Sequence, residues 1–169
     1  MKQNWTEEFK SNSLYRIDES VRMLRICVER LDSRGFWERP NPASNSIGNL
    51  LLHLSGNMRQ YVVSGLGGAP DTRIRDAEFS QDLRQDPEVV WEQFLGTVSE
   101  VREVIQKATE AELLTKKWVQ GFNLSGLGMV LHAVEHLSYH TGQIAWAVKA
   151  AQGSDLGFYD GTDLNLKNQ

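Results

Sequence analysis

The sequence predicts an all-α protein, a four-helix bundle. Apolar residues recur at helical spacing in four segments, and the alternation typical of strands is nowhere sustained. Gly, Pro and small polar residues separate these segments. With 169 residues, 40% of them hydrophobic and 24% charged, the chain has the size and composition of one globular domain. We expect that domain to cover residues 1–169, with an ordered core over residues 5–151.

The first two predicted helices are marked by an apolar stripe and a capping residue. Over residues 6–31 the apolar positions lie on one face; they are Leu14, Ile17, Val21, Leu24, Val28 and Leu31. A loop with Gly and Pro follows. Ser46 is the expected N-cap of the second helix, with Asn45 or Ser44 as alternatives. The glycine-rich stretch at residues 65–68 ends that helix.

The third and fourth helices follow a long connection. Residues 65–85 contain charges and a proline, and a connection of this length predicts a crossover along the bundle. Asp86 as N-cap and Pro87 in the first turn begin the third helix. The fourth covers residues 125–151, and Gly153 is its expected stop signal.

Two segments lack helical periodicity. Residues 118–122 are expected to form a short extended piece or a loop. Residues 154–169 are rich in Asp, Gly and Asn, which predicts an irregular, loosely packed tail.

Charge and composition narrow the class of partner. The net charge of −4 gives no support to nucleic-acid binding, which usually shows a basic surface. No apolar run approaches the roughly 20 residues of a membrane span, and the polar first ten residues resemble no signal or transit peptide. A single cysteine, Cys27 in an apolar stretch, predicts a buried, unreactive thiol and a cytoplasmic location.

The histidines carry the functional prediction. His132, His136 and His140 are spaced by four residues, which places neighbouring pairs on one side of a helix. Two neutral imidazoles one turn apart can share a divalent metal, and His53 on the second helix would add a third nitrogen. The favoured pair is His136 with His140; His132 with His136 is the alternative.

Two metal-enzyme patterns fit poorly. His132 to His136 matches the H-x-x-E-H pattern of one protease class, but no glutamate follows His136 to act as the further ligand. A ferritin-like site needs Glu-x-x-His pairs, and none of His53, His136 and His140 has a glutamate three residues before it. Both classes are therefore disfavoured.

Helical phase supplies candidates for the surrounding pocket. The polar candidates are His132, Asn49, Asn57 and Gln143. The aromatic candidates for its walls are Tyr61, Tyr139 and Trp146, each of which fits a core or surface role as well. Arg73 and Arg75 are expected in a solvated loop, with contact to an anionic thiol or substrate as the alternative. No catalytic acid or base is assigned.

Two motifs together resemble a known family. Leu-Leu-His53-Leu and His136-Leu-Ser-Tyr-His140-Thr-Gly-Gln143 are similar to the DinB-like (damage-inducible, YfiT-type) bundle superfamily, in an uncharacterised subgroup, over residues 5–151. The resemblance implies an up-down-down-up bundle, often a homodimer, with a metal held by His53, His136 and His140. It further implies chemistry like that of characterised relatives, which include transferases and isomerases that use low-molecular-weight thiols.

The chemistry of such a site defines the expected function. Three neutral imidazoles leave a divalent ion, most readily Zn or Ni, with its full charge and an exchangeable position. A bound thiol or water is then activated, so we expect a thiol-dependent transferase or a hydrolase acting on a small molecule. The alternatives are a non-catalytic, stress-related metal-binding protein, or histidines that only hydrogen-bond to one another.

Overall fold

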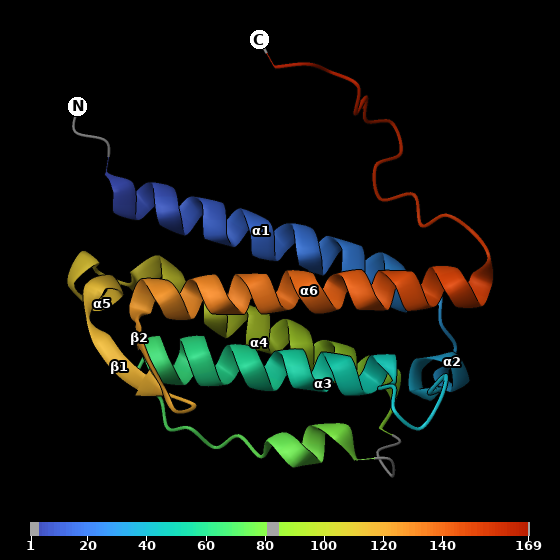
Figure 1. Ribbon diagram of the computed structural model, residues 1–169, viewed down its shortest axis with the longest axis horizontal. Coiled ribbons are helices and arrows are strands. Elements are labelled where there is room, and N and C mark those ends of the chain that lie inside the picture. The colour runs from blue at the N-terminus through green and yellow to red at the C-terminus, as the bar shows by residue number, and fades with distance from the viewer. Residues whose placement is uncertain (1–3, 81–84, 169) are drawn as a thin grey trace.

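The chain folds into a bundle of long helices, described by a computed structural model over residues 4–80 and 85–168. Helices α1 and α6 pack together, as do α3 and α4, and α3 also packs against α6 (Figure 1). An all-α bundle is thus confirmed, with a small sheet added to it. The long helices are α1 (Trp5–Val28), α3 (Ile47–Met58), α4 (Pro87–Lys107) and α6 (Gly126–Gln152).

The core lies where the apolar stripes of these helices meet. Fully buried side chains come from each of them, including Leu24 of α1, Leu54 of α3, Phe94 of α4 and Leu137 of α6. Burying a side chain of this size contributes about 1.5–3 kcal/mol. This packing fixes α3 beside α6, which is the interface that carries the histidines.

The predicted helix boundaries are confirmed at their capping residues. The Ser46 hydroxyl accepts the Asn49 N–H, and the Asn49 side chain returns the contact as a capping box. Asp86 caps α4 and Ser125 caps α6 through their own side chains. Gly153 ends α6 with a φ of 64°, a left-handed conformation that favours glycine.

The segment between α1 and α3 differs from the prediction. Helix α1 ends at Val28, three residues before the predicted Leu31. A short helix, α2 (Ser33–Trp37), follows, capped by the Asp32 carboxylate. Its five residues are too few to show periodicity, yet they bury the Phe36 ring in the core.

The connection between α3 and α4 runs along the bundle, as its length predicts (Figure 1). Helix α3 first continues as a π-helix, η1 (Arg59–Leu66). A 3-10 helix, η2 (Arg75–Phe79), then lies against α3, where the Asn49 Nδ2 donates to the carbonyl oxygens of Glu78 and Ser80 at 2.9 and 3.3 Å. Residues 81–84 of the predicted crossover lie outside the described residues.

A β-hairpin precedes α6, where the sequence predicts only an extended piece or a loop. After the short helix α5 (Glu110–Leu114), strands β1 (Lys116–Val119) and β2 (Phe122–Ser125) pair antiparallel. Strands of four residues are too short to show sustained alternation. Gln120 and Gly121 connect them with φ angles of 47° and 82°, the left-handed pair that tight hairpin turns require.

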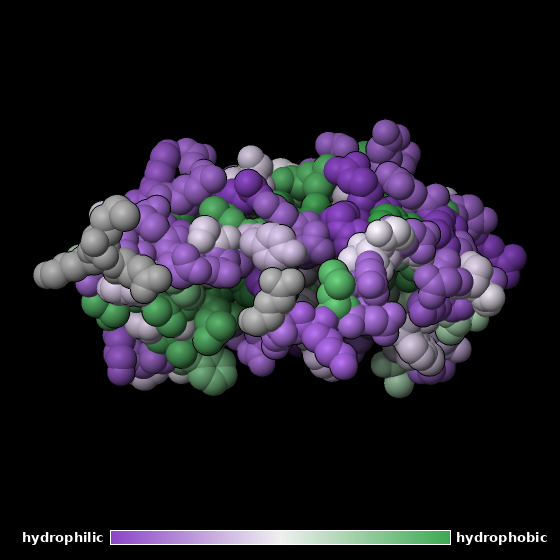
Figure 2. Space-filling view, turned by 90° about the horizontal axis from the view of Figure 1, so that it is seen from above, coloured by the Kyte–Doolittle hydropathy of each residue, from purple (hydrophilic) through white to green (hydrophobic). Residues whose placement is uncertain are grey.

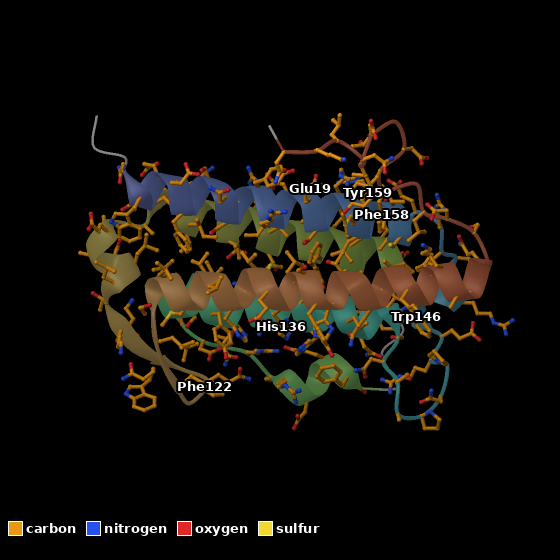
Figure 3. The ribbon with its side chains drawn as sticks, turned by 45° about the horizontal axis from the view of Figure 1, so that its top comes forward. Glu19, Phe122, His136, Trp146, Phe158 and Tyr159 are labelled. Carbon is orange, nitrogen blue, oxygen red and sulfur yellow. The ribbon has the colours of Figure 1, made fainter. Side chains whose placement is uncertain are left out.

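The C-terminal tail is irregular but anchored at its start. Leu156 is buried, and Arg30 donates hydrogen bonds to the carbonyl oxygens of Asp155 and Leu156. Arg22 donates to the Phe158 carbonyl oxygen, which places this part of the tail beside α1 (Figure 3).

The helices of residues 4–80 and 85–168 do not match a membrane span. No helix there is both long and apolar enough to cross a bilayer. The face seen from above is mostly hydrophilic, with separate hydrophobic patches (Figure 2).

Candidate metal centre

Three histidines converge between α3 and α6. One nitrogen from each of His53, His136 and His140 lies within 4.8 Å of the others. The Nε2 atoms of His53 and His136 are 3.2 Å apart, close to the roughly 3.3 Å between two nitrogens that bind one tetrahedral zinc at about 2.05 Å. Figure 3 shows His136 on the side of α6 that faces the crossover. The three rings are therefore close enough to bind one metal ion.

The His53 ring is oriented by a carboxylate from the crossover. Its Nδ1 lies 2.9 Å from Glu78 Oε2, and a carboxylate can only accept, so Nδ1 carries the hydrogen. The lone pair of Nε2 then faces the other histidines. Arg73 Nη2 is 2.9 Å from the same Oε2 and 3.2 Å from His53 Nδ1. The His53 Nδ1 hydrogen and the Arg73 Nη2 hydrogen are therefore both donated to Glu78 Oε2. This is the carboxylate–histidine arrangement that orients metal ligands.

Glu78 belongs to a buried charged network. Arg73 Nε donates to Glu78 Oε1 at 2.7 Å, and Arg73 Nη1 donates to Gln60 Oε1 at 2.8 Å. Burial raises the pKa of Glu78, but the hydrogen bonds and charges of Arg73 and His53 outweigh it and lower that pKa below its usual value. The carboxylate is therefore charged at neutral pH.

The expectation of a solvated Arg73 is wrong. Its side chain is only 4% exposed, because it pairs with Glu78 of the same crossover. That pairing also occupies the guanidinium nitrogens that an anionic ligand would need. Arg75 is exposed, and it lies over the Phe79 ring at 5.1 Å.

Gly56 makes room for this carboxylate. A Cβ at Gly56 would lie 1.9 Å from Glu78 Oε1, well inside contact distance. Because Gly56 follows His53 by three residues, its bare backbone lets Glu78 approach α3 on the same side as the His53 ring. Sequence reasoning assigned Glu78 no role, and no local pattern marks it, since only the folded crossover brings it to His53.

The two histidines that α6 contributes to this group, His136 and His140, are neutral at neutral pH. His140 Nδ1 donates to Gln143 Oε1 at 2.7 Å, which leaves the His140 Nε2 lone pair for a metal. Burial lowers the pKa of His140, the bond to Gln143 opposes this, and the charge of His53 adds to the lowering. Burial, together with the neighbouring histidines, lowers the pKa of His136 to about 3. Neutral imidazole is the form that binds metals.

His132 is not one of the three grouped histidines, although its ring lies 5.6 Å from the His136 ring. Its ring stacks on Tyr61 at 3.9 Å, and its Nε2 contacts Asn57 Nδ2 at 3.2 Å. The structure therefore groups His136 with His140, not with His132. Asn57 contacts His132, whereas Asn49 anchors the crossover and so serves the fold.

The remaining predicted wall residues divide between core and surface. Tyr61 is buried in the core beside His132. Tyr139 and Trp146 instead line a surface cleft together with Gln143. Gln143 thus contacts both the cleft and His140.

The bundle of long helices has the same fold as two DinB-like proteins of known structure. The chain belongs to the family described as a protein of unknown function, DUF1572, which matches residues 4–158. A comparison with curated proteins found no match.

Solved structures share the fold at low sequence identity. A conserved protein from Enterococcus faecalis is 12% identical, with a TM-score of 0.71 over 85% of this chain and 97% of its own. A DinB-like protein from Bacillus cereus is 16% identical, with a TM-score of 0.67 over 86% and 91%. The DinB-like YjoA from Bacillus subtilis is 16% identical, with a TM-score of 0.63 over 83% and 91%. These similarities establish the fold alone.

Proposed function

We propose that this protein is a divalent-metal-dependent enzyme that activates a thiol or water for attack on a small molecule. The supporting observation is the number of ligands. Three histidines approach one another, and within residues 4–80 and 85–168 no further His, Cys, Asp or Glu joins their group. Three protein ligands with an open position are typical of catalytic zinc, whereas structural zinc is closed by four.

Two hydrogen bonds within the chain orient the histidine rings of this site. Glu78 and Gln143 accept the Nδ1 hydrogens of His53 and His140, so both rings present Nε2 lone pairs. A divalent ion bound there would deprotonate a thiol or lower the pKa of a water to about 7. Zn and Ni are the proposed ions, because both suit imidazole ligands.

The thiol must come from outside the chain. Cys27 is fully buried, and burial raises the pKa of its thiol to about 11. A protonated thiol in the core does not act as a nucleophile. A low-molecular-weight thiol is therefore the proposed cosubstrate, and a hydrolase using water is the second form of the same proposal.

The DinB-like resemblance adds proposals about organisation. We propose one domain, an up-down-down-up order of the long helices, a homodimer and a cytoplasmic location. Sedimentation velocity tests the dimer directly.

A non-catalytic metal-binding protein, related to stress, is the second candidate. The ligands come from α3 and α6, so an ion would cross-link two helices that are far apart in the chain. Metal binding of this kind stabilises a fold without any reaction.

Metal analysis of untagged protein tests the ligand set. We expect close to one ion per chain in the wild type, and loss of it in His53→Ala and in His140→Ala. His132→Ala is the matched control and should keep its metal, because the His132 Nε2 contacts Asn57 and His132 is not in the ligand group. Metal retained by both ligand variants, or none after zinc and nickel are supplied, would contradict the proposal.

Cobalt substitution separates the two candidates. The visible spectrum of the cobalt protein should change when 2-mercaptoethanol is added, because an open position accepts the thiolate. Turnover of an aryl halide with that thiol, or of an aryl ester with water, should then depend on His53. A spectrum that neither thiol nor azide alters would favour the non-catalytic candidate.

A further inference from the structure

A cleft opens on the surface of α6, next to the histidines. Its volume is about 590 Å³, within the range of small-molecule sites, about 300–1,000 Å³. It is lined by Tyr139, Gln143 and Trp146 of α6 and by Pro40 and Asn45 from the loop before α3. The two aromatic side chains are largely exposed, at 62% and 71%.

The cleft begins one helical turn from the proposed metal ligands. Helices α3 and α6 run in opposite directions (Figure 1). The lining residue Leu50 precedes His53 by three residues, and Gln143 follows His140 by three. Three residues advance a helix by about 4.5 Å, so both helices place a lining residue on the same side of the histidines. The Tyr139 ring also meets the His140 ring edge-on, with centroids 5.0 Å apart.

Gln143 connects the cleft to the histidines. Its Oε1 accepts the His140 Nδ1 hydrogen, and the same side chain lines the cleft. Within the described part of the chain, its amide nitrogen donates to no protein acceptor. Its two N–H donors therefore remain for a ligand.

The residues that line the cleft favour an uncharged ligand. No Asp, Glu, Lys, Arg or His is among the described residues that line the cleft. A charged ligand would lose hydration there without gaining a countercharge. Arg39, adjacent in sequence to the lining residue Pro40, instead donates to Asn49 Oδ1 and the Phe79 carbonyl oxygen, both at 2.8 Å.

The geometry points to a binding site for an uncharged, ring-bearing small molecule with a hydrogen-bond acceptor. The ring lies against Tyr139 and Trp146, and the acceptor meets the Gln143 amide. This inference rests on the proposed function for its meaning, since it assigns the cleft to the substrate of the metal centre. It deepens that function by naming the class of substrate.

Gly142 provides a variant that closes the cleft without disturbing the core. It lines the cleft, and a Cβ built there meets no atom within 4 Å. Gly142→Leu therefore fills open space on α6. Gly96→Leu is the matched control, because Gly96 also lies within a long helix, α4, with nothing within 4 Å of a Cβ.

Three probes of similar size test the selectivity by saturation-transfer NMR: phenylacetamide, phenylacetate and phenethylamine. We expect phenylacetamide to bind at least about tenfold more tightly than the two ions, the effect of roughly 1.4 kcal/mol. Gly142→Leu should abolish this binding and Gly96→Leu should keep it. Gln143→Leu should weaken phenylacetamide about tenfold through one lost hydrogen bond, while leaving ethylbenzene unchanged. Equal binding of phenylacetate, or binding that survives Gly142→Leu, would overturn the inference.

Cobalt-loaded protein distinguishes this inference from the proposed function. If both hold, cobalt broadens the phenylacetamide signals, and zinc does not. The protein could instead take up no cobalt and still bind phenylacetamide in a way that Gly142→Leu abolishes. That result would support the cleft as a binding site and contradict the proposed metal enzyme. Cobalt uptake without broadening of a bound probe would separate the cleft from the centre and overturn the inference.

Discussion

The two sides of the histidine cluster are built differently. On the α6 side, His140 has one neutral partner, Gln143, which is exposed to solvent. On the crossover side, His53 contacts Glu78, which pairs with Arg73, and all three side chains are at most 10% exposed. Gln143 can therefore change with little effect on the fold, whereas the crossover side combines ligand orientation with structural stability.

The largest expected effect is the loss of the buried carboxylate. Glu78→Ala leaves the Arg73 guanidinium buried without a countercharge, which typically costs about 3–5 kcal/mol. Urea denaturation of metal-free protein measures this loss. Glu103→Ala is the control, because Glu103 forms an exposed pair with Lys107, and its midpoint should stay at the wild-type value. Equal midpoints for the two variants would remove the contrast between the two sides.

The pH dependence of stability should also separate the two sides. The pKa of His136 is about 3 in the folded chain, against 6.5 for an ordinary histidine, so the unfolded chain binds the proton first. Stability from a neutral His136 is full above pH 6.5 and is lost as the pH falls toward 3, by on the order of 3 kcal/mol. Glu78, with its pKa lowered below 4.5, contributes a loss that begins only below that value.

Denaturation of metal-free protein between pH 3 and 8 tests these two windows. His136→Gln should reduce the loss of stability between pH 6.5 and pH 4.5, and Glu78→Gln should reduce the loss below pH 4.5. A wild-type stability that stays constant from pH 7 to pH 5 would contradict the burial of a neutral His136.

Sequence could predict the α6 side because its determinants are local. The four-residue spacing of His136 and His140 places them together on any regular helix, and Ser125 and Gly153 mark the ends of that helix. The same helical periodicity placed His53 on the second predicted helix. Packing of α3 against α6 then brought the three rings together.

The crossover side could not be predicted, because its contacts are tertiary. Glu78 is 25 residues from His53 in the chain, in a segment without periodicity. Arg73 lies in the same segment, and nothing in its local sequence distinguishes it from a solvated loop arginine. The hairpin before α6 and the short helix α2 were missed for a different reason: segments of four or five residues are shorter than the patterns that identify them.

Replacing Gly56 by alanine should destabilise the crossover side less than Glu78→Ala does. Gly96→Ala, in an open part of α4, should stabilise the protein by up to about 1 kcal/mol, the usual gain of alanine within a helix. Gly56→Ala should instead destabilise it by about 1 kcal/mol, because its Cβ displaces the end of Glu78 and weakens the bonds to His53 and Arg73. Thermal denaturation compares them, and a stabilised Gly56→Ala would show that Glu78 can move without loss.

The smallest effect on stability is expected at Gln143, where only metal affinity should change. Gln143→Leu removes the acceptor that holds the hydrogen on His140 Nδ1, so the ring can present the wrong tautomer to the metal. Loss of such a partner typically weakens metal binding about tenfold or more, whereas an exposed side chain contributes little to folding. Competition with a zinc indicator measures the affinity, and urea denaturation measures stability in the same sample. If Gln143→Leu lowered stability as Glu78→Ala does, the α6 side would be structural too, and the two sides would no longer differ in kind.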